Sequence, residues 1–283
     1  MAEKVVSLET YLKQLPRLNL KMNNNIFYRG QSKLDYKLTP SVLRDNMQCK
    51  EHEIYNEIMI ECAHEFADCE LHNEILSKMQ HYGVPTRLLD VTTNPLVALY
   101  FACCSNQNVD DGVVYIIKKD KSEIKQYDSD VISILSSLPR FNLGEKEEIL
   151  QLAQDIDATI KKFNAKKIIK RLLHEIKKEK PAFENIINPK DLLENFVFVP
   201  RKANARIIRQ SGAFIIFGLL QNEIKIDETC SDDNLTNNIS YKIIINKDAK
   251  TEIVEQLSCF GISKATLHPE LYKVAEYIKE RYR

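Results

Sequence analysis

Apolar residues recur at helical spacing over long stretches of the chain. From Glu51 to Gln80 they lie three or four positions apart, with an interruption near Cys69–His72, which predicts a helix that breaks into two. Residues 95–104 are apolar nearly all round, so a buried helix is expected there. Shorter helices are expected at 5–20, where Ser7 is a candidate N-cap, at 249–257, and from His268 to Arg283.

Short runs rich in β-branched and aromatic residues alternate with these helices. Ile26–Gly30 is typical of a short strand that ends at a glycine, and Val113–Ile117 of a buried strand. Residues 91–95 are expected to form a turn that caps the helix beginning at Pro95. Further strands are predicted at 196–200, within 207–218 and at 241–245, so the chain as a whole has the pattern of an α+β fold with four or more strands.

Residues 120–195 differ from the rest of the chain. Lysine, glutamate and helical periodicity from Leu143 to Lys180 predict two or more surface helices, as an insertion or small subdomain within a single domain of residues 1–283. Nine basic residues between Lys161 and Lys180 make this stretch locally basic. A solvated helix face explains them, and a surface for a protein or nucleic-acid partner is the alternative.

Composition places the chain among ordinary globular proteins. Lys+Arg and Asp+Glu balance at 40 each, so the total charge indicates no nucleic-acid or membrane partner. No apolar run approaches the roughly 20 residues of a membrane helix, and the first residues lack a signal-peptide pattern. The seven cysteines form no Cys-x-x-Cys pair, as expected of a reduced cytoplasmic protein in which most cysteines are small core residues. The oligomeric state is left open.

Glycine is scarce, and its positions point to candidate sites. Three of the seven glycines lie in short polar motifs, at Gly30, Gly83 and Gly212. Glycine costs backbone entropy on folding, so it tends to be kept where a backbone angle or a close approach requires it. We therefore consider these three motifs together.

The first two motifs carry side chains suited to ligand contact. Arg29, at the end of a predicted strand, suits bidentate contact with phosphate, ribose or carboxylate, and a structural salt bridge is the alternative. His81 can donate, accept or bind a metal, or be a satisfied structural residue. Tyr82 can stack on a ring or simply pack. Arg87 and Asp90 are expected to pair with each other or to cap neighbouring backbone.

The remaining candidates are Thr92, Thr93 and Gln210. The two threonines can hydrogen-bond a sugar or cap the helix at Pro95, and one cap explains only one of them. The amide of Gln210 can bind a ribose hydroxyl but cannot act as a strong general base. No metal site is expected, because His64-Glu65 lacks the second histidine of a His-Glu-x-x-His motif. Phosphate-loop, dinucleotide-fold and nucleophile-elbow glycine patterns are also missing from the sequence.

These motifs resemble those of the FRG domain family, which is named for a Phe-Arg-Gly motif. The first motif stands here as Phe27-Tyr28-Arg29-Gly30-Gln31. The most specific match is His81-Tyr82-Gly83-Val84-Pro85-Thr86-Arg87-Leu88-Leu89-Asp90, followed by Val91 where the family usually has tryptophan. The resemblance continues through Asn94-Pro95, the stretch 204–214, Phe260-Gly261-Ile262 and His268-Pro269-Glu270-Leu271, and so covers about residues 24–280.

The order of the motifs is also similar to that of the ADP-ribosyltransferase fold. This looser resemblance implies a split mixed or antiparallel sheet flanked by helices, with a cleft for a nucleotide such as NAD, and no metal. Gln210 stands where transferases often have glutamate, so ADP-ribosyl transfer, NAD cleavage and binding alone stay open, as does a role as a toxin or in phage defence. The alternative is a non-catalytic interaction module acting through residues 143–180. The resemblance assigns catalysis to Arg29, His81 and Gln210, and cofactor binding to Tyr28, Gly30, Tyr82, Thr92 and Thr93.

Overall fold

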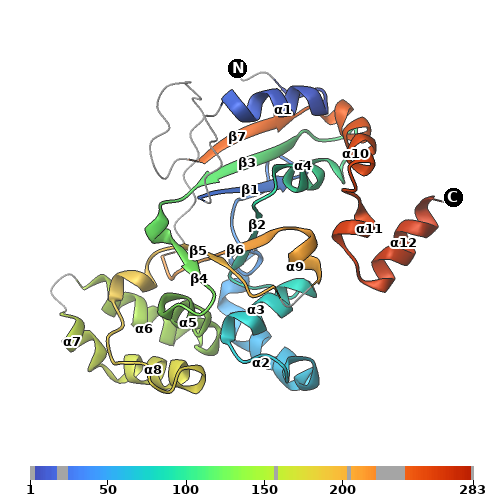
Figure 1. Cartoon of the computed structure of the whole chain (residues 1–283). Helices are drawn as coiled ribbons and strands as arrows, with labels where there is room; N and C mark the ends of the chain where they lie inside the picture. Colours follow the sequence, from blue (N-terminus) through green and yellow to red (C-terminus); the bar gives the residue numbers. More distant parts are fainter. Residues whose placement is uncertain (1–3, 18–24, 156–158, 203–204, 221–239, 282–283) are drawn as a thin grey trace.

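A seven-stranded sheet runs through the molecule and is flanked by helices (Figure 1). Its order is β4-β5-β6-β2-β1-β3-β7, and all neighbouring strands are antiparallel except β4 and β5. The predicted α+β fold is therefore confirmed. The strands are β1 (Ile26–Gln31), β2 (Leu88–Thr92), β3 (Gly112–Lys118), β4 (Ile124–Gln126), β5 (Phe196–Val199), β6 (Gly212–Ile216) and β7 (Ser240–Ile245). The computed structural model describes residues 4–17, 25–155, 159–202, 205–220 and 240–281.

The sheet is split between β1 and β2. These two strands share a single register pair, Tyr28 opposite Thr92, whereas β1 pairs with β3 from Ile26 to Gln31 and β2 pairs with β6 from Leu88 to Thr92. The sheet thus consists of one half made of β1, β3 and β7 and another made of β2, β6, β5 and β4.

Helices cover the two halves separately. The first half packs against α1 (Leu8–Arg17), α4 (Pro95–Cys103) and α10 (Lys250–Cys259) through a core that includes Tyr11 and Val114. The second half packs against a core from Tyr55, Leu76 and Ile169. Its helices are α2 (Glu51–Glu61), α3 (His72–His81), α5 (Asp130–Ser136), α6 (Leu143–Gln154), α7 (Ile160–Asn164) and α8 (Lys167–Glu179).

The opposite face of the sheet has its own apolar cluster, which crosses both halves. Phe27 of β1, Val91 of β2 and Ile215 of β6 meet Leu38 there. The remaining helices are α9 (Ala205–Arg209), α11 (Lys264–Leu267) and α12 (Leu271–Arg281), and the 3-10 turns are η1 (Ser41–Leu43), η2 (Met47–Lys50), η3 (Ala63–Phe66), η4 (Lys121–Glu123), η5 (Leu138–Arg140), η6 (Pro189–Leu192) and η7 (Lys247–Ala249).

Helix α4 lies directly on β1, and Gly30 permits this contact. A Cβ atom at Gly30 would lie 1.8 Å from the carbonyl oxygen of Ala98 and 2.7 Å from the backbone nitrogen of Ala102. The helix begins as the sequence predicts, because the Asn94 side chain accepts from the Leu96 backbone N–H at 2.9 Å and Pro95 is its first residue. Gly30 is thus required for the packing of α4 on β1.

The predicted break of the helix 51–80 into two is confirmed, although it begins earlier than expected, after Glu61, and contains η3. Two other predictions about local structure were wrong. Residues 91–92 end strand β2 instead of forming a turn, since they pair with Ala213 and Gly212 of β6. Of the described cysteines only Cys103 is fully buried, because most of the others lie at or beside helix ends.

Some predictions fall outside the described residues, namely Cys230, residues 18–20 of the first predicted helix and residues 282–283 of the last. Among the helices that the structure does describe, none combines the length and the apolar character needed to cross a membrane.

Candidate functional site

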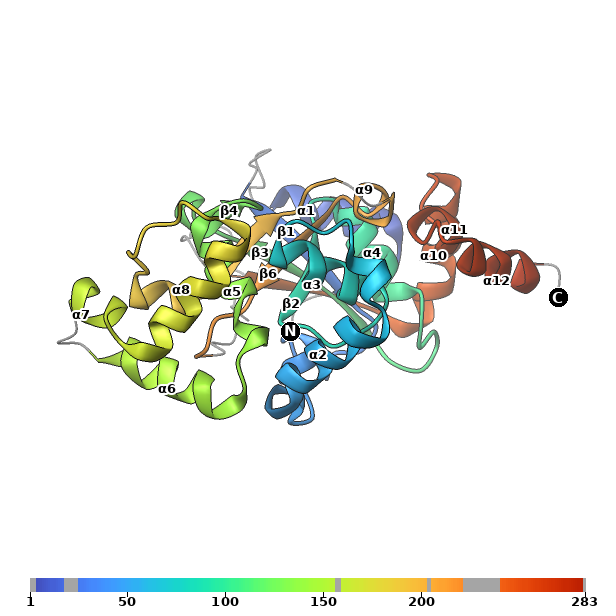
Figure 2. The same ribbon diagram turned by 90° about the horizontal axis from the view of Figure 1, so that it is seen from below.

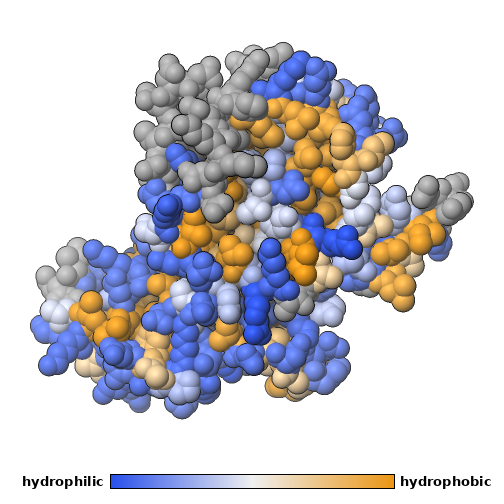
Figure 3. All heavy atoms as spheres, in the orientation of Figure 1, coloured by the Kyte–Doolittle hydropathy of each residue, from blue (hydrophilic) through white to orange (hydrophobic). Residues whose placement is uncertain are grey.

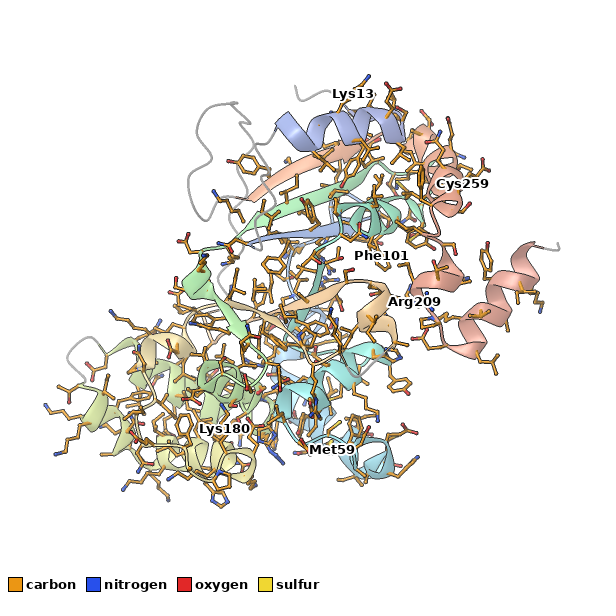
Figure 4. All side chains as sticks on the ribbon, viewed as in Figure 1. Lys13, Met59, Phe101, Lys180, Arg209 and Cys259 are labelled. Atoms are coloured by element: carbon orange, nitrogen blue, oxygen red, sulfur yellow. The ribbon has the colours of Figure 1, made fainter. Side chains whose placement is uncertain are left out.

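A cavity of about 160 Å³ opens where β1 separates from β2. Strand residues form its floor, α4 forms one wall and α9 another; in Figure 4 these walls are marked by Phe101 and by Arg209. The cavity is lined by Tyr28, Arg29, Gly30, Asp90, Val91, Thr92, Val97, Phe101, Arg206 and Gln210. It therefore contains two guanidinium groups, one carboxylate and two aromatic rings.

Arg29 bridges the split in the sheet. Its Nη1 donates to the carbonyl oxygen of Asp90 at 2.6 Å and lies 4.0 Å from the Asp90 carboxylate. Its Nε is buried without a hydrogen-bond partner. Burial lowers the pKa of Arg29, and Asp90 opposes this effect, but an arginine stays charged in a protein. Arg29 thus brings a positive charge to the cavity.

Asp90 adds a half-exposed carboxylate to the cavity. Its Oδ2 accepts from Gln80 Nε2 at 2.7 Å, and its side chain is 49% exposed. The expected pairing of Arg87 with Asp90 is wrong. The two positions are three residues apart along an extended strand, so their side chains point to opposite faces. Arg87 instead forms a buried ion pair with Glu51.

Arg206 is the second cation of the cavity, and it was not singled out from the sequence. It lies on α9, and its Nη1 donates to the carbonyl oxygen of His81 at 2.9 Å. The turn from α9 into β6 passes through Ser211 in the left-handed conformation (φ 48°). This turn brings Arg206 and Gln210 back over the end of β2. The only sequence signal was the place of Arg206 within the motif 204–214, of which residue 204 lies outside the described residues.

Gln210 and Thr92 line the cavity, but their polar atoms already have partners. Gln210 Nε2 donates to the carbonyl oxygen of Leu267 at 3.0 Å, which fastens the site to α11. Thr92 Oγ1 donates to the carbonyl oxygen of Gln210 at 2.6 Å and accepts from the Asn94 backbone N–H at 3.0 Å. Thr92 therefore supports the site by tying β2 to the turn after α9.

His81 lies beside this cavity, in a smaller one of about 30 Å³ that shares Asp90, Arg206 and Gln210 with it. Its Nε2 is 2.9 Å from a carboxylate oxygen of Glu270. Burial and the charge of Arg206 lower the pKa of His81, while Glu270 acts in the opposite direction. In the sequence, Glu270 is marked only by its place in the motif His268-Pro269-Glu270-Leu271.

The structure does not bring every predicted residue to the cavity. Thr93 is exposed and donates its backbone N–H to Ser211 instead. Tyr82 is 60% exposed and lines a separate cavity of about 330 Å³ with Lys78, Arg201 and Ile207. Tyr28 and Gly30 do line the cavity at the split. The described residues contain no group of three or more histidine, cysteine, aspartate or glutamate side chains placed to hold a metal ion.

Comparison with known families covers the first part of the site. Residues 24–111 match the family described as the FRG domain. The chain contains an FRG domain. Comparison with curated proteins and with solved structures gave no match. The matched FRG segment supplies β1, β2 and α4, and hence Arg29 and Asp90, whereas Arg206, Gln210 and Glu270 come from beyond it.

Proposed function

We propose that this FRG-domain protein binds a nucleotide, with NAD as the leading candidate, through its phosphates in the cavity at the split in the sheet. The observation that carries the proposal is that Arg29 of β1 and Arg206 of α9 line one cavity. Guanidinium groups bind phosphate oxygens with paired hydrogen bonds. Tyr28 and Phe101 add aromatic surface beside them, as is common in nucleotide sites.

The proposed chemistry is cleavage of the bond between nicotinamide and ribose. The bond's electron pair leaves with nicotinamide, which becomes neutral, and the ribose C1′ gains oxocarbenium character. A water or an acceptor nucleophile then bonds to C1′ and releases a proton. Asp90 is the carboxylate within the cavity that can stabilise the developing positive charge, a role that Gln210 cannot fill. Water as the nucleophile gives NAD cleavage, and a protein acceptor gives ADP-ribosyl transfer.

A likeness to the ADP-ribosyltransferase fold is part of the proposal. It is supported by the split between β1 and β2, by a cavity at that split, and by the apolar helix α4 that follows Thr92. A toxin or phage-defence role would suit an enzyme that consumes NAD, and we include it in the proposal.

Calorimetric titration with NAD and with pyrophosphate tests the binding step. We expect Arg29→Ala and Arg206→Ala each to weaken binding of both ligands about 10- to 100-fold, the loss typical of one charged hydrogen-bonding group. Arg209→Ala is the matched control, because Arg209 lies on the same helix, is exposed and lines no described cavity. A wild-type chain that binds neither ligand would overturn the proposal.

Mass spectrometry of the products and of the protein after incubation with NAD tests the chemical step. Free ADP-ribose indicates cleavage, and a mass increase on a protein indicates transfer. Asp90→Asn is expected to abolish either product while leaving pyrophosphate binding intact, since it removes the charge but keeps the size of the side chain. Binding without any product in the wild-type chain would restrict the function to nucleotide binding.

A further inference from the structure

Five exposed lysines gather on α7 and on the first turns of α8, far from the cavity. Other basic residues of this region pair with acids: Arg171 with Glu145, and Lys180 with Asp130. Within the described residues, no carboxylate forms an ion pair with any of the five. We call them the lysine surface, and they are Lys161, Lys162, Lys166, Lys167 and Lys170.

Two residues of the lysine surface occupy an unfavourable place on their helix. The N-terminus of a helix bears a partial positive charge, so acids are favoured there and lysines are not. Lys166 is the N-cap of α8 and Lys167 is its first residue. The first turn of α8 contains no acid, and Lys166 provides no side-chain cap. The fold therefore gains nothing from positive charge at these two positions.

A neighbouring helix has the favourable arrangement. At the start of α6, Asn142 and Glu145 form a reciprocal capping box. Thr159 likewise caps α7 by accepting from the Lys162 backbone N–H. Caps that stabilise helices thus occur in the same region, and at α8 Lys166 stands where such a cap would be expected. An external anion would account for keeping a lysine there.

The surroundings favour phosphates over apolar or aromatic partners. Membrane-surface helices expose a broad apolar face beside their lysines, and single-stranded nucleic acid is bound through exposed aromatic rings. Phe163 and Phe183 are buried. The apolar side of α8 is also buried in the core, at Ile168, Ile169, Leu172, Leu173 and Ile176.

We propose that the lysine surface binds the phosphate backbone of double-stranded nucleic acid without reading its base sequence. Lysine charge is the main feature of this surface, beside which α7 exposes Ile160, and phosphate contacts position a protein on a duplex without specifying a base. Figures 1 and 2 place α7 and α8 at the end of the molecule opposite α12, and Figure 3 shows a mostly hydrophilic surface there. The proposal does not depend on nucleotide binding in the cavity.

Fluorescence anisotropy of the full chain with a labelled duplex of arbitrary sequence, over a salt series, is the direct test. Each phosphate neutralised contributes about −0.9 to the slope of log affinity against log salt, so five lysines predict a slope of about −4 to −5. Replacing all five lysines by alanine is expected to abolish binding. The matched control makes the same charge change at five exposed lysines elsewhere and should retain most of the affinity; these are Lys37, Lys50, Lys121, Lys202 and Lys247.

A second variant separates binding from folding. Lys166→Asp with Lys167→Glu gives α8 a favourable cap and an acidic first turn, so the midpoint of thermal unfolding should rise by about 2–6 °C. The same change should reduce duplex affinity at least tenfold. No wild-type binding to a duplex at low salt, equal binding by the five-alanine variant, or preferential binding to single strands or to anionic lipid vesicles would each overturn the proposal.

Discussion

The contacts of the buried Glu51 carboxylate determine how much stability its removal should cost. Glu51 begins α2 and receives Arg87 Nε at 2.9 Å and Lys146 Nζ at 2.6 Å, and all three side chains are buried. Burial acts to raise the pKa of Glu51, but Arg87 and Lys146 lower it from 4.5 to about 2. At about 1.4 kcal/mol per pKa unit, this fall corresponds to about 3 kcal/mol of stability at neutral pH. Removing one partner of a buried ion pair costs about 3–5 kcal/mol in general.

We therefore expect Glu51→Gln to lower the free energy of unfolding at pH 7 by about 3–5 kcal/mol, measured by urea denaturation. Glu57→Gln, at an exposed position of the same helix, should change it by less than about 0.5 kcal/mol. Because the folded-state pKa is lowered, the contribution is present above 4.5 and is lost as the pH falls toward about 2. The difference between wild type and Glu51→Gln should shrink over that range. A loss below about 1 kcal/mol at pH 7 would refute the reasoning.

Two further predictions concern Gly30 and His268. Gly30→Ala should lower the free energy of unfolding by at least about 1–3 kcal/mol in the same assay, because the new Cβ would lie 1.8 Å from the backbone of α4. Gly212→Ala should cost much less, because the nearest neighbour of its Cβ would be 3.5 Å away. Equal losses for the two variants would contradict the packing argument. Burial and Arg206 lower the pKa of His268 from 6.5 to about 4, so the stability of the protein should fall as the pH drops from 6.5 toward 4. His268→Asn should make the midpoint of thermal unfolding less dependent on pH over this range. An unchanged dependence in the variant would show that other groups cause it.

The sequence predicts those parts of the fold that local patterns determine. A continuous apolar run after a predicted cap placed α4, and runs rich in β-branched and aromatic residues placed β1 and β3 close to their observed bounds. Strand β2 was missed because Asp90 interrupts its apolar run with a charge. That charge is tolerated because Asp90 faces the opening between the two halves of the sheet, where it is half exposed. The charged residue that lines the cavity is therefore also what hid this strand from pattern analysis.

The candidate site was only partly predictable, because its two arginines are brought to one cavity by contacts between residues that lie far apart in the sequence. Arg29 stood out as an arginine between a strand and a glycine, whereas Arg206 lies in a short exposed helix with no such mark. Glu270 reaches His81 from the C-terminal part of the chain, 189 positions further along. No periodicity or local motif encodes a contact of that span. Asp90 was interpreted as scaffolding because its sequence neighbours include Arg87, and strand geometry separates the two.

The split in the sheet explains why these separated residues form one site. Antiparallel strands normally satisfy each other's backbone groups, and an opening leaves polar groups that need other partners. Here the Arg29 side chain donates to the Asp90 carbonyl oxygen from across the opening, and Arg206 donates to the His81 carbonyl oxygen at the C-terminal end of α3. Each arginine therefore makes a hydrogen bond to the backbone that holds its side chain in place before any ligand binds. An anion bound between them would meet donors already held in place, and such preorganisation lowers the entropic cost of binding.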